Sequence, residues 1–434
     1  MKLLWLRVTG FMFFFILSTS FSFSQHAISD SLREIQRQIE ILTQEIERMR
    51  LGEVAEERYE AQRGLGPAAA RVYQLKKSGV SIAGYGEVVY ENYSQKREDG
   101  VGANKLDQVD FLRNIIYVGF RFNDWILFNS EIEFEHGTTG KTDAAGKPIG
   151  EVSIEFGYIE LMFSKQFNLR AGMVLPPLGI VNEKHEPSTF HGTLRPQVER
   201  AIIPSTWRTN GIGAYGELTP ALSYRAYIVE GLNAKNFSDS EGIRGGRQSG
   251  AKALAEDLAF TSKVEYSGFS GSILGASFYY GNSGQGATDS LGTIKAATTL
   301  LSVHGEFAWM GLELRALYAQ VTVDDAGRVS KLAKKTVGSE MNGWYAVAAY
   351  DIVPLFAQGS KHYLAPFLQY ERLNTQTAVA SGFTASKAND RAFLVAGLTY
   401  KPHPNVAFKF DSRQNSNEQK TGINQWNLAV NYLF

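Results

Sequence analysis

From residue 80 onward, hydrophobic and polar residues alternate one by one along most of the chain. A period of two is typical of β-strands, because successive side chains point to opposite faces of a sheet. We therefore expect strands in sixteen segments. They lie near residues 80–93, 108–122, 125–136, 151–163, 167–174, 211–218, 221–232, 257–267, 271–281, 297–308, 311–323, 342–352, 362–373, 390–401, 405–414 and 423–434.

The connections between these segments are alternately short and long. The short ones lie at 123–124, 165–166, 219–220, 267–270, 309–310, 353–360 and 402–403, and the long ones at 94–107, 137–150, 175–210, 233–256, 282–295, 324–341, 374–389 and 415–422. Transmembrane barrels sort their connections in this way, with short periplasmic turns and long external loops. The pattern predicts an all-β fold, a 16-stranded antiparallel transmembrane β-barrel over residues 80–434.

Each strand should place apolar side chains toward lipid and charged side chains toward the lumen. On 125–136, for example, Ile126 and Phe128 are predicted to face outward. The predicted lumen acids of that strand are Glu131, Glu133 and Glu135. A charge on the lipid face would cost roughly 2–4 kcal/mol at the midplane, so the sorting should be strict. A charged lumen needs water, which predicts a pore or a liganded cavity.

The last strand carries an additional signal. Trp426, Leu428, Val430, Tyr432 and Phe434 share one face, and the chain ends on that phenylalanine. This tail resembles the insertion signal of bacterial outer-membrane barrels, so we assign that role to Tyr432 and Phe434. It predicts a location in the bacterial outer membrane, with membrane lipid and the barrel-assembly machinery as partners.

The N-terminus has the organisation of an export signal. Lys2 and Arg7 precede an apolar stretch at 8–17, and small residues follow at Ser22 and Ser24. We predict a signal peptide over residues 1–24, cleaved before Gln25. The alternative is an uncleaved signal anchor, although ten apolar residues are too few to span a bilayer.

Between the signal and the barrel, apolar residues recur at alternating spacings of four and three. They are Ile28, Leu32, Ile35, Ile39, Leu42, Ile46 and Met49. Such a narrow seam requires an identical helix beside it and predicts a periplasmic coiled-coil helix over 25–63. The mixture of Ile and Leu does not decide between dimer and trimer, and a lone helical spacer remains the alternative. The sequence Gly64-Leu65-Gly66-Pro67 ends the helix and begins a predicted linker over 64–79.

Composition excludes several other classes of protein. Lys plus Arg and Asp plus Glu each number 44, and the zero net charge argues against nucleic acid as a partner. The absence of cysteine excludes disulfides, thiol catalysis, cysteine zinc sites and a lipoprotein anchor. Apart from the N-terminus, no apolar run reaches the roughly 18 residues of a membrane helix.

Several segments together resemble a known family. The opening strand Gly84-Tyr85-Gly86-Glu87, the loop from Pro176-Pro177-Leu178 through Trp207-Arg208-Thr209 and the C-terminal Phe434 are similar to those of the phosphate-selective porins O and P. The resemblance implies a homotrimeric channel with the third loop, 175–210, folded inward as a constriction. Members selective for phosphate carry a ladder of arginines, whereas the lumen arginines of this chain are interspersed with carboxylates.

The predicted function is a porin for passive diffusion of small anionic or neutral solutes. The lumen wall carries nine acids and eight bases, so its net field is too weak to select ions and the third loop should decide. We predict a modest preference for anions such as phosphate. The candidate residues are Lys184, Arg195, Arg200 and Arg208 in the loop and Arg170 and Arg225 on the wall. Two alternatives remain: the arginines pin the loop to wall carboxylates, or the barrel binds a ligand or adheres to a partner through its external loops.

Other chemistry is weakly supported by the sequence. Glu183, His185, Glu186 and His191 could ligate a metal, but polar loops have the same composition and nothing fixes the spacing. Residues 242–250 offer glycine N–H groups and two arginines as an anion cradle, or simply a flexible loop. No histidine lies on a strand beside Ser or Asp in the pattern of hydrolytic barrels. We therefore predict no enzyme activity, catalytic residue, cofactor or metal.

Overall fold

The computed structural model describes residues 38, 61–143, 146 and 149–434. The chain divides into two compact units, Met1–Arg58 and Tyr59–Phe434, and the second unit contains the barrel. The predicted signal peptide lies outside the described residues, as does nearly all of the predicted coiled coil. Among the residues that are described, no helix is long and apolar enough to cross a membrane.

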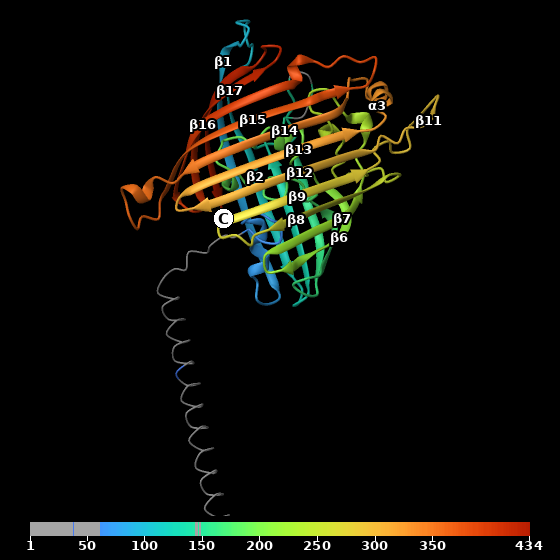
Figure 1. Cartoon of the computed structure of the whole chain (residues 1–434). Helices are drawn as coiled ribbons and strands as arrows, with labels where there is room; N and C mark the ends of the chain where they lie inside the picture. The colour runs from blue at the N-terminus through green and yellow to red at the C-terminus, as the bar shows by residue number, and fades with distance from the viewer. Residues whose placement is uncertain (1–37, 39–60, 144–145, 147–148) are drawn as a thin grey trace, which may run out of the picture. The chain divides into compact units, whose positions relative to one another are not determined.

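Sixteen strands form one closed antiparallel barrel, which confirms the predicted fold (Figure 1). They are β1 (Gly79–Arg97), β2 (Gln108–Arg121), β3 (Ile126–Glu135), β4 (Val152–Met162), β5 (Asn168–Val174), β6 (Thr209–Thr219), β7 (Leu222–Glu230), β8 (Leu258–Tyr266), β9 (Ser272–Gly281), β12 (Thr298–Trp309), β13 (Leu312–Val323), β14 (Gly338–Tyr350), β15 (Tyr363–Val379), β16 (Asp390–His403), β17 (Val406–Asn417) and β18 (Ile423–Leu433). Each corresponds to one predicted segment. Short and long connections alternate as predicted except at two places: the predicted short connection after β14 spans 351–362, and the predicted long connection after β17 spans only 418–422.

The remaining elements are short, and all except η1, which precedes β1, lie in the connections between strands. A separate hairpin, β10 (Thr288–Asp289) with β11 (Gly292–Thr293), lies in the loop between β9 and β12. The helical segments are η1 (Ala69–Gln74), η2 (Pro187–Thr189), α2 (Val198–Ala201), η3 (Ala234–Asn236), η4 (Arg244–Gly246), α3 (Ala326–Ala333), η5 (Val353–Leu355) and η6 (Lys387–Asn389).

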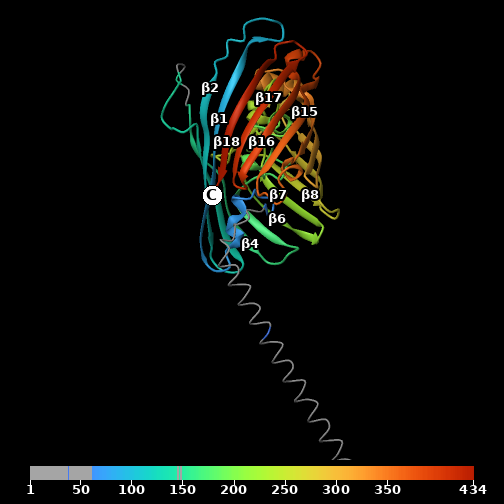
Figure 2. The same ribbon diagram turned by 90° about the vertical axis from the view of Figure 1, so that its left-hand side faces the viewer.

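The barrel closes where its first and last strands meet (Figure 2). β1 pairs with β18 in a register that places Val88 opposite Val430. The backbone N–H of Gly84 donates to the Phe434 carbonyl at 2.8 Å, and the Phe434 N–H donates back at 2.9 Å. Closure leaves no unpaired strand edge, which is a requirement for any sheet that spans a membrane.

Side chains sort between the two faces of the wall as predicted. On β17, Phe408 and Phe410 are 46% and 43% exposed on the outside, whereas Lys409 and Arg413 are only 3% and 2% exposed on the inside. Aromatic side chains gather at the short turns, where Trp125 stacks on Phe163. An apolar outer band flanked by aromatic side chains defines a barrel of the bacterial outer membrane.

The predicted linker 64–79 contains η1, which packs against the inner wall near the short turns. Ala68 is fully buried. The Asn129 amide donates to the Ala69 carbonyl at 2.9 Å, and the Tyr73 hydroxyl donates to Glu160 at 2.8 Å. This segment has no alternating pattern because it contacts the lumen wall through a 3-10 helix of six residues.

Candidate pore constriction

The third loop, residues 175–208, lies inside the barrel and contacts its wall on two sides. Toward β3 and β4, the His185 ring contacts the Glu131 and Glu155 carboxylates. Toward β17, Thr193 donates to Asp411 from both its N–H (2.6 Å) and its hydroxyl (2.7 Å). The loop therefore crosses the lumen.

Lys409 forms the most concentrated of these anchors. Its ammonium group donates to the carbonyl oxygens of Pro187 and Phe190 at 2.6 Å each and to that of Gly192 at 3.0 Å. An ammonium group has three protons, and the loop carbonyls accept all three. A wall lysine thus fixes the position of the η2 region.

Two loop side chains organise the loop itself. One oxygen of Glu199 accepts hydrogen bonds from the N–H groups of Ile180 and Val181, each at 2.7 Å, and the other accepts from the Tyr345 hydroxyl at 2.5 Å. Asn182 accepts from the N–H of Trp207 at 2.7 Å and donates to its carbonyl. These bonds satisfy backbone groups that would otherwise be buried without partners.

The two predicted wall residues, Arg170 and Arg225, are buried in ion pairs. Arg170 binds Glu160 at 2.9 Å, in the network that holds η1. Arg225 pairs with Glu265, and with Glu183 of the third loop at 2.9 Å. Both guanidinium groups therefore hold other segments of this chain in place.

Three of the four predicted loop residues also have carboxylate partners. Arg200 pairs with Glu241 at 2.9 Å. Arg208 pairs with Glu155 at 3.0 Å, and Lys184 with Glu306 at 3.9 Å. Arg195 differs, because it donates to the His185 carbonyl at 3.0 Å and makes no ion pair within 4.0 Å in the described part of the chain.

A cavity of about 280 Å³ lies beside Arg195. Its charged lining consists of Arg113, Arg195, Arg200 and Arg244, together with Glu87 and Glu135. Arg244 and Arg247 come from the loop between β7 and β8, and their guanidinium groups donate to the Ser205 carbonyl at 2.9 and 2.8 Å. Burial, then the neighbouring Arg247 and Arg200, lowers the pKa of Arg244 to about 9.

The segment 242–250 thus lies against the third loop and supplies two arginines next to it. The site residues predicted from the sequence do not include Arg244, although the candidate anion cradle at 242–250 contains it. Its approach to the third loop depends on contacts between two loops, for which the sequence carries no periodic signal.

A second cavity, of about 210 Å³, adjoins the third loop at residues 190–196, on the side nearer the short turns. It is lined by His191, Pro196, Glu306, Glu313 and Arg315 among others. His191 contacts Glu313 at 3.2 Å, and burial lowers the pKa of the ring against the opposing effect of that carboxylate. Phe190 lines both cavities, so residues 190–197 separate them.

A third cavity, of about 560 Å³, opens at the short-turn end of β5 to β8. Its charged lining includes Arg63, Lys165, Lys184 and Arg225, with Glu217 and Glu265. Basic residues outnumber acidic ones in this lining, as they do in the cavity beside Arg195.

The structure also places the predicted lumen acids and the predicted insertion signal. Glu131 and Glu133 are buried on the inner face of β3, and Glu135 lines the cavity beside Arg195. Tyr432 and Phe434 lie on the outer face, with ring centroids 6.5 Å apart. Their role in membrane insertion stays a prediction.

Several solved structures share this architecture. OmpF of Salmonella typhi, in complex with daunomycin, is 16% identical and superposes with a TM-score of 0.53 over 82% of this chain and 98% of that chain. An anion-selective porin from Comamonas acidovorans is 12% identical with a TM-score of 0.52 over 82% and 100%. A loop-deletion mutant of OmpT, an outer-membrane protein of Vibrio cholerae, is 12% identical with a TM-score of 0.51 over 83% and 100%.

The protein is therefore an outer-membrane β-barrel with the sixteen-stranded fold of these porins. No family model matches the chain. An uncharacterized protein of Aquifex aeolicus (strain VF5) is 37% identical over 398 residues, which cover 89% of this chain and 87% of that protein. The chain belongs to the family of that Aquifex protein.

Proposed function

We propose that this protein is an outer-membrane porin through which small hydrophilic solutes diffuse passively, with a modest preference for anions such as phosphate. The observation that carries the proposal is the cavity beside Arg195, where four arginines and two glutamates line a space of about 280 Å³ within the barrel. An excess of positive charge in a narrow aqueous space attracts anions and repels cations.

The third loop is the proposed constriction. Residues 190–197 separate two cavities and are fixed to the wall by Lys409 and Asp411. Charges at the narrowest point have the least water to screen them, so this segment should dominate ion selectivity.

Arg195 is the arginine to which we assign the largest share of this selectivity. Arg200 and Arg208 each have a carboxylate partner at about the distance of a hydrogen bond, which offsets their field. Arg113 pairs with Glu87 at the longer distance of 3.4 Å. The sequence analysis left open the alternative that these arginines pin the loop to wall carboxylates. That alternative describes Arg208, which joins the loop to β4, better than it describes Arg195.

We further propose a homotrimer held in part by the heptad seam of residues 28–49. A seam confined to two heptad positions buries its apolar side chains only against another helix. Three barrels side by side would also cover part of the apolar outer surface.

Solute uptake into liposomes tests the proposal. Liposomes containing the purified protein should swell at rates that decrease with solute size, and faster in phosphate than in a neutral solute of equal size. Protein-free liposomes and liposomes with the heat-denatured protein are the controls. The absence of any uptake would contradict the porin function and would favour a barrel that binds a ligand or a partner through its external loops.

A further inference from the structure

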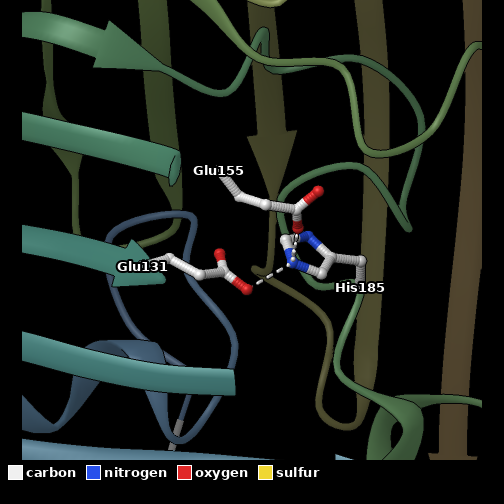
Figure 3. A group of neighbouring side chains, drawn as sticks. All are labelled: Glu131, Glu155 and His185. Carbon is white, nitrogen blue, oxygen red and sulfur yellow. Dashed lines mark hydrogen bonds and ion pairs between the residues drawn. The ribbon is translucent and has the colours of Figure 1, made fainter. Parts of the chain in front are cut away.

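Three side chains that are far apart in the sequence converge at one buried point (Figure 3). Glu131 comes from β3, Glu155 from β4 and His185 from the third loop. The Nε2 atom of His185 lies 3.0 Å from Glu131 Oε1 and 3.2 Å from Glu155 Oε2. The three side chains are 0%, 1% and 2% exposed, respectively, counted over the whole residue.

The hydrogen bonds around this cluster orient the ring. His185 Nδ1 lies 3.0 Å from the carbonyl oxygen of Asn182, which can only accept a hydrogen bond. The Nδ1 atom therefore carries a proton, and a neutral ring directs the lone pair of Nε2 toward the two carboxylates. Metal-binding histidines are commonly oriented in this way, with one ring nitrogen donating to a carbonyl or carboxylate.

Each carboxylate also has an outer partner. The Tyr117 hydroxyl donates to Glu131 at 3.2 Å, and Arg208 donates to Glu155 at 3.0 Å. Glu131 Oε2 is buried without a hydrogen-bond partner, and the neighbour of Glu155 Oε2 is the Nε2 atom of His185 at 3.2 Å, which has no proton to donate when the ring is neutral. A buried polar atom without a partner requires an explanation, and a bound ion is one.

Buried carboxylates outnumber the arginines around this cluster. Four buried carboxylates lie close together, those of Glu131, Glu133, Glu155 and Glu186. Within the described residues, the only lysine or arginine that forms an ion pair with any of these four is Arg208. Arg195 donates a hydrogen bond to the His185 carbonyl, which places a second guanidinium group near the cluster. Arg113 lies near Glu133 and Glu155 and is a third arginine in this region, so four buried carboxylates share three arginines and the His185 ring.

We propose that Glu131, Glu155 and His185 bind one divalent transition-metal ion, with Zn²⁺ as the best match. One imidazole and two carboxylates are suitable zinc ligands, and atoms bound at roughly 2.0–2.2 Å around a tetrahedral ion lie roughly 3.3 Å apart. The two separations from His185 Nε2 are close to that value, and all three ligand atoms lie within 4.8 Å of one another. A fourth position remains for water.

Such an ion would join the third loop to two wall strands beside the proposed constriction. Arg195 is held by the carbonyl of the same His185. The ion would therefore fix the position of this arginine as well as of the loop. The site differs from the metal candidates predicted from the sequence. Among the four predicted loop residues, only His185 belongs to it, and the other two ligands come from the wall.

Metal analysis of the full-length protein tests the site. Protein purified from membranes without chelators should contain about one zinc ion per chain by inductively coupled plasma mass spectrometry. The variants His185→Gln and Glu155→Gln should each lose it. His304→Gln, which alters a buried strand histidine 3.6 Å from Glu265, is the matched control and should retain the ion.

A second measurement does not depend on folding of the variants. The wild-type chain, denatured with chelator and refolded into detergent with Co²⁺, should acquire visible ligand-field absorption with one cobalt per chain, and added Zn²⁺ should displace it. Protein that holds no ion after either procedure overturns the proposal and leaves a His185 imidazolium between two carboxylates. Conductance is measured separately, so the porin function can fail without affecting this result.

Discussion

At the level of single residues, ion pairing determines which charges act on a passing solute. The guanidinium groups of Arg170 and Arg225 are each paired with buried glutamates, and their field is largely cancelled within the wall. Arg195 has no such partner within 4.0 Å among the described residues and lines a cavity. A unit charge about 4 Å from an ion contributes about 1 kcal/mol even in bulk water.

The first prediction follows for Arg195. Substitution Arg195→Ala should lower the anion-to-cation permeability ratio about two- to fivefold, because about 1 kcal/mol corresponds to about a fivefold change in occupancy. Reversal potentials of the variant and wild type, measured in the same salt gradient, provide the comparison. Arg328→Ala is the matched control, since Arg328 pairs with Asp289 in an external loop and should leave the ratio unchanged. An unchanged ratio in the triple variant Arg195→Ala, Arg200→Ala, Arg208→Ala would refute the assignment.

The second prediction concerns the anchor at Lys409. Substitution Lys409→Met keeps the length of the side chain but leaves three loop carbonyls without their donor. Each buried acceptor without a partner costs about 1–3 kcal/mol, so the loop should move away from the wall. Single-channel recordings should show larger or more variable conductance than the wild type. Lys387→Met, which removes an exposed ion pair with Glu418 in the external loops, should not change the conductance. A wild-type trace from the Lys409 variant would show that this anchor does not hold the constriction.

The residue types of the constriction could be predicted from the sequence, but their pairing could not. The position of Arg195, Arg200 and Arg208 in one long loop is visible from the connection lengths alone. Which arginine meets a carboxylate depends on Glu155 and Glu241, which lie on other segments. A single sequence has no local signal for such a contact.

At the level of elements, the strands follow from the sequence because two solvents act on them. Lipid outside and water inside impose a strict period of two, as in β17, where Phe408 and Phe410 alternate with Lys409 and Asp411. The third loop has no comparable constraint. Its anchors, such as Thr193 on Asp411, join residues 218 positions apart. Only the family resemblance predicts its inward course, and the sequence pattern predicts a linker where the buried η1 segment lies.

The last strand gives the third prediction. Deletion of Phe434 removes both backbone hydrogen bonds to Gly84 at the closure and an aromatic ring that is 46% exposed on the lipid face. Outer-membrane levels of the protein should therefore fall, with aggregate in the periplasm, as measured by membrane fractionation and immunoblotting. Phe269→Ala, at an exposed aromatic position on a short turn, should have little effect. Equal membrane levels after the deletion would count against an insertion signal.

At the level of the whole molecule, the proposed trimer depends mainly on the heptad seam of residues 28–49 and not on the barrel. Deletion of residues 25–62 should weaken the trimer without abolishing the barrel, because the seam of residues 28–49 contributes association energy and the sixteen strands close without it. Native mass spectrometry in mild detergent measures the change. Replacing Ile35 and Ile39 by Lys should act like the deletion, whereas replacing Gln36 and Gln38, outside the seam, should not. A monomer in the intact wild type would contradict the proposal.

The structure of the whole barrel also determines the width of the channel and its ion selectivity. The lumen is divided by a fixed loop, with a basic cavity beside Arg195 on one side and, on the other, a cavity whose lining includes Glu306, Glu313 and Arg315, so the channel should be narrow and its selectivity moderate. Ion conduction through one protein in a planar bilayer reports on the opening and on its charge together. Under a KCl gradient, the reversal potential of the wild type should shift modestly toward the equilibrium potential of chloride. Clear cation selectivity, or no conductance at all, would contradict an anion-preferring porin.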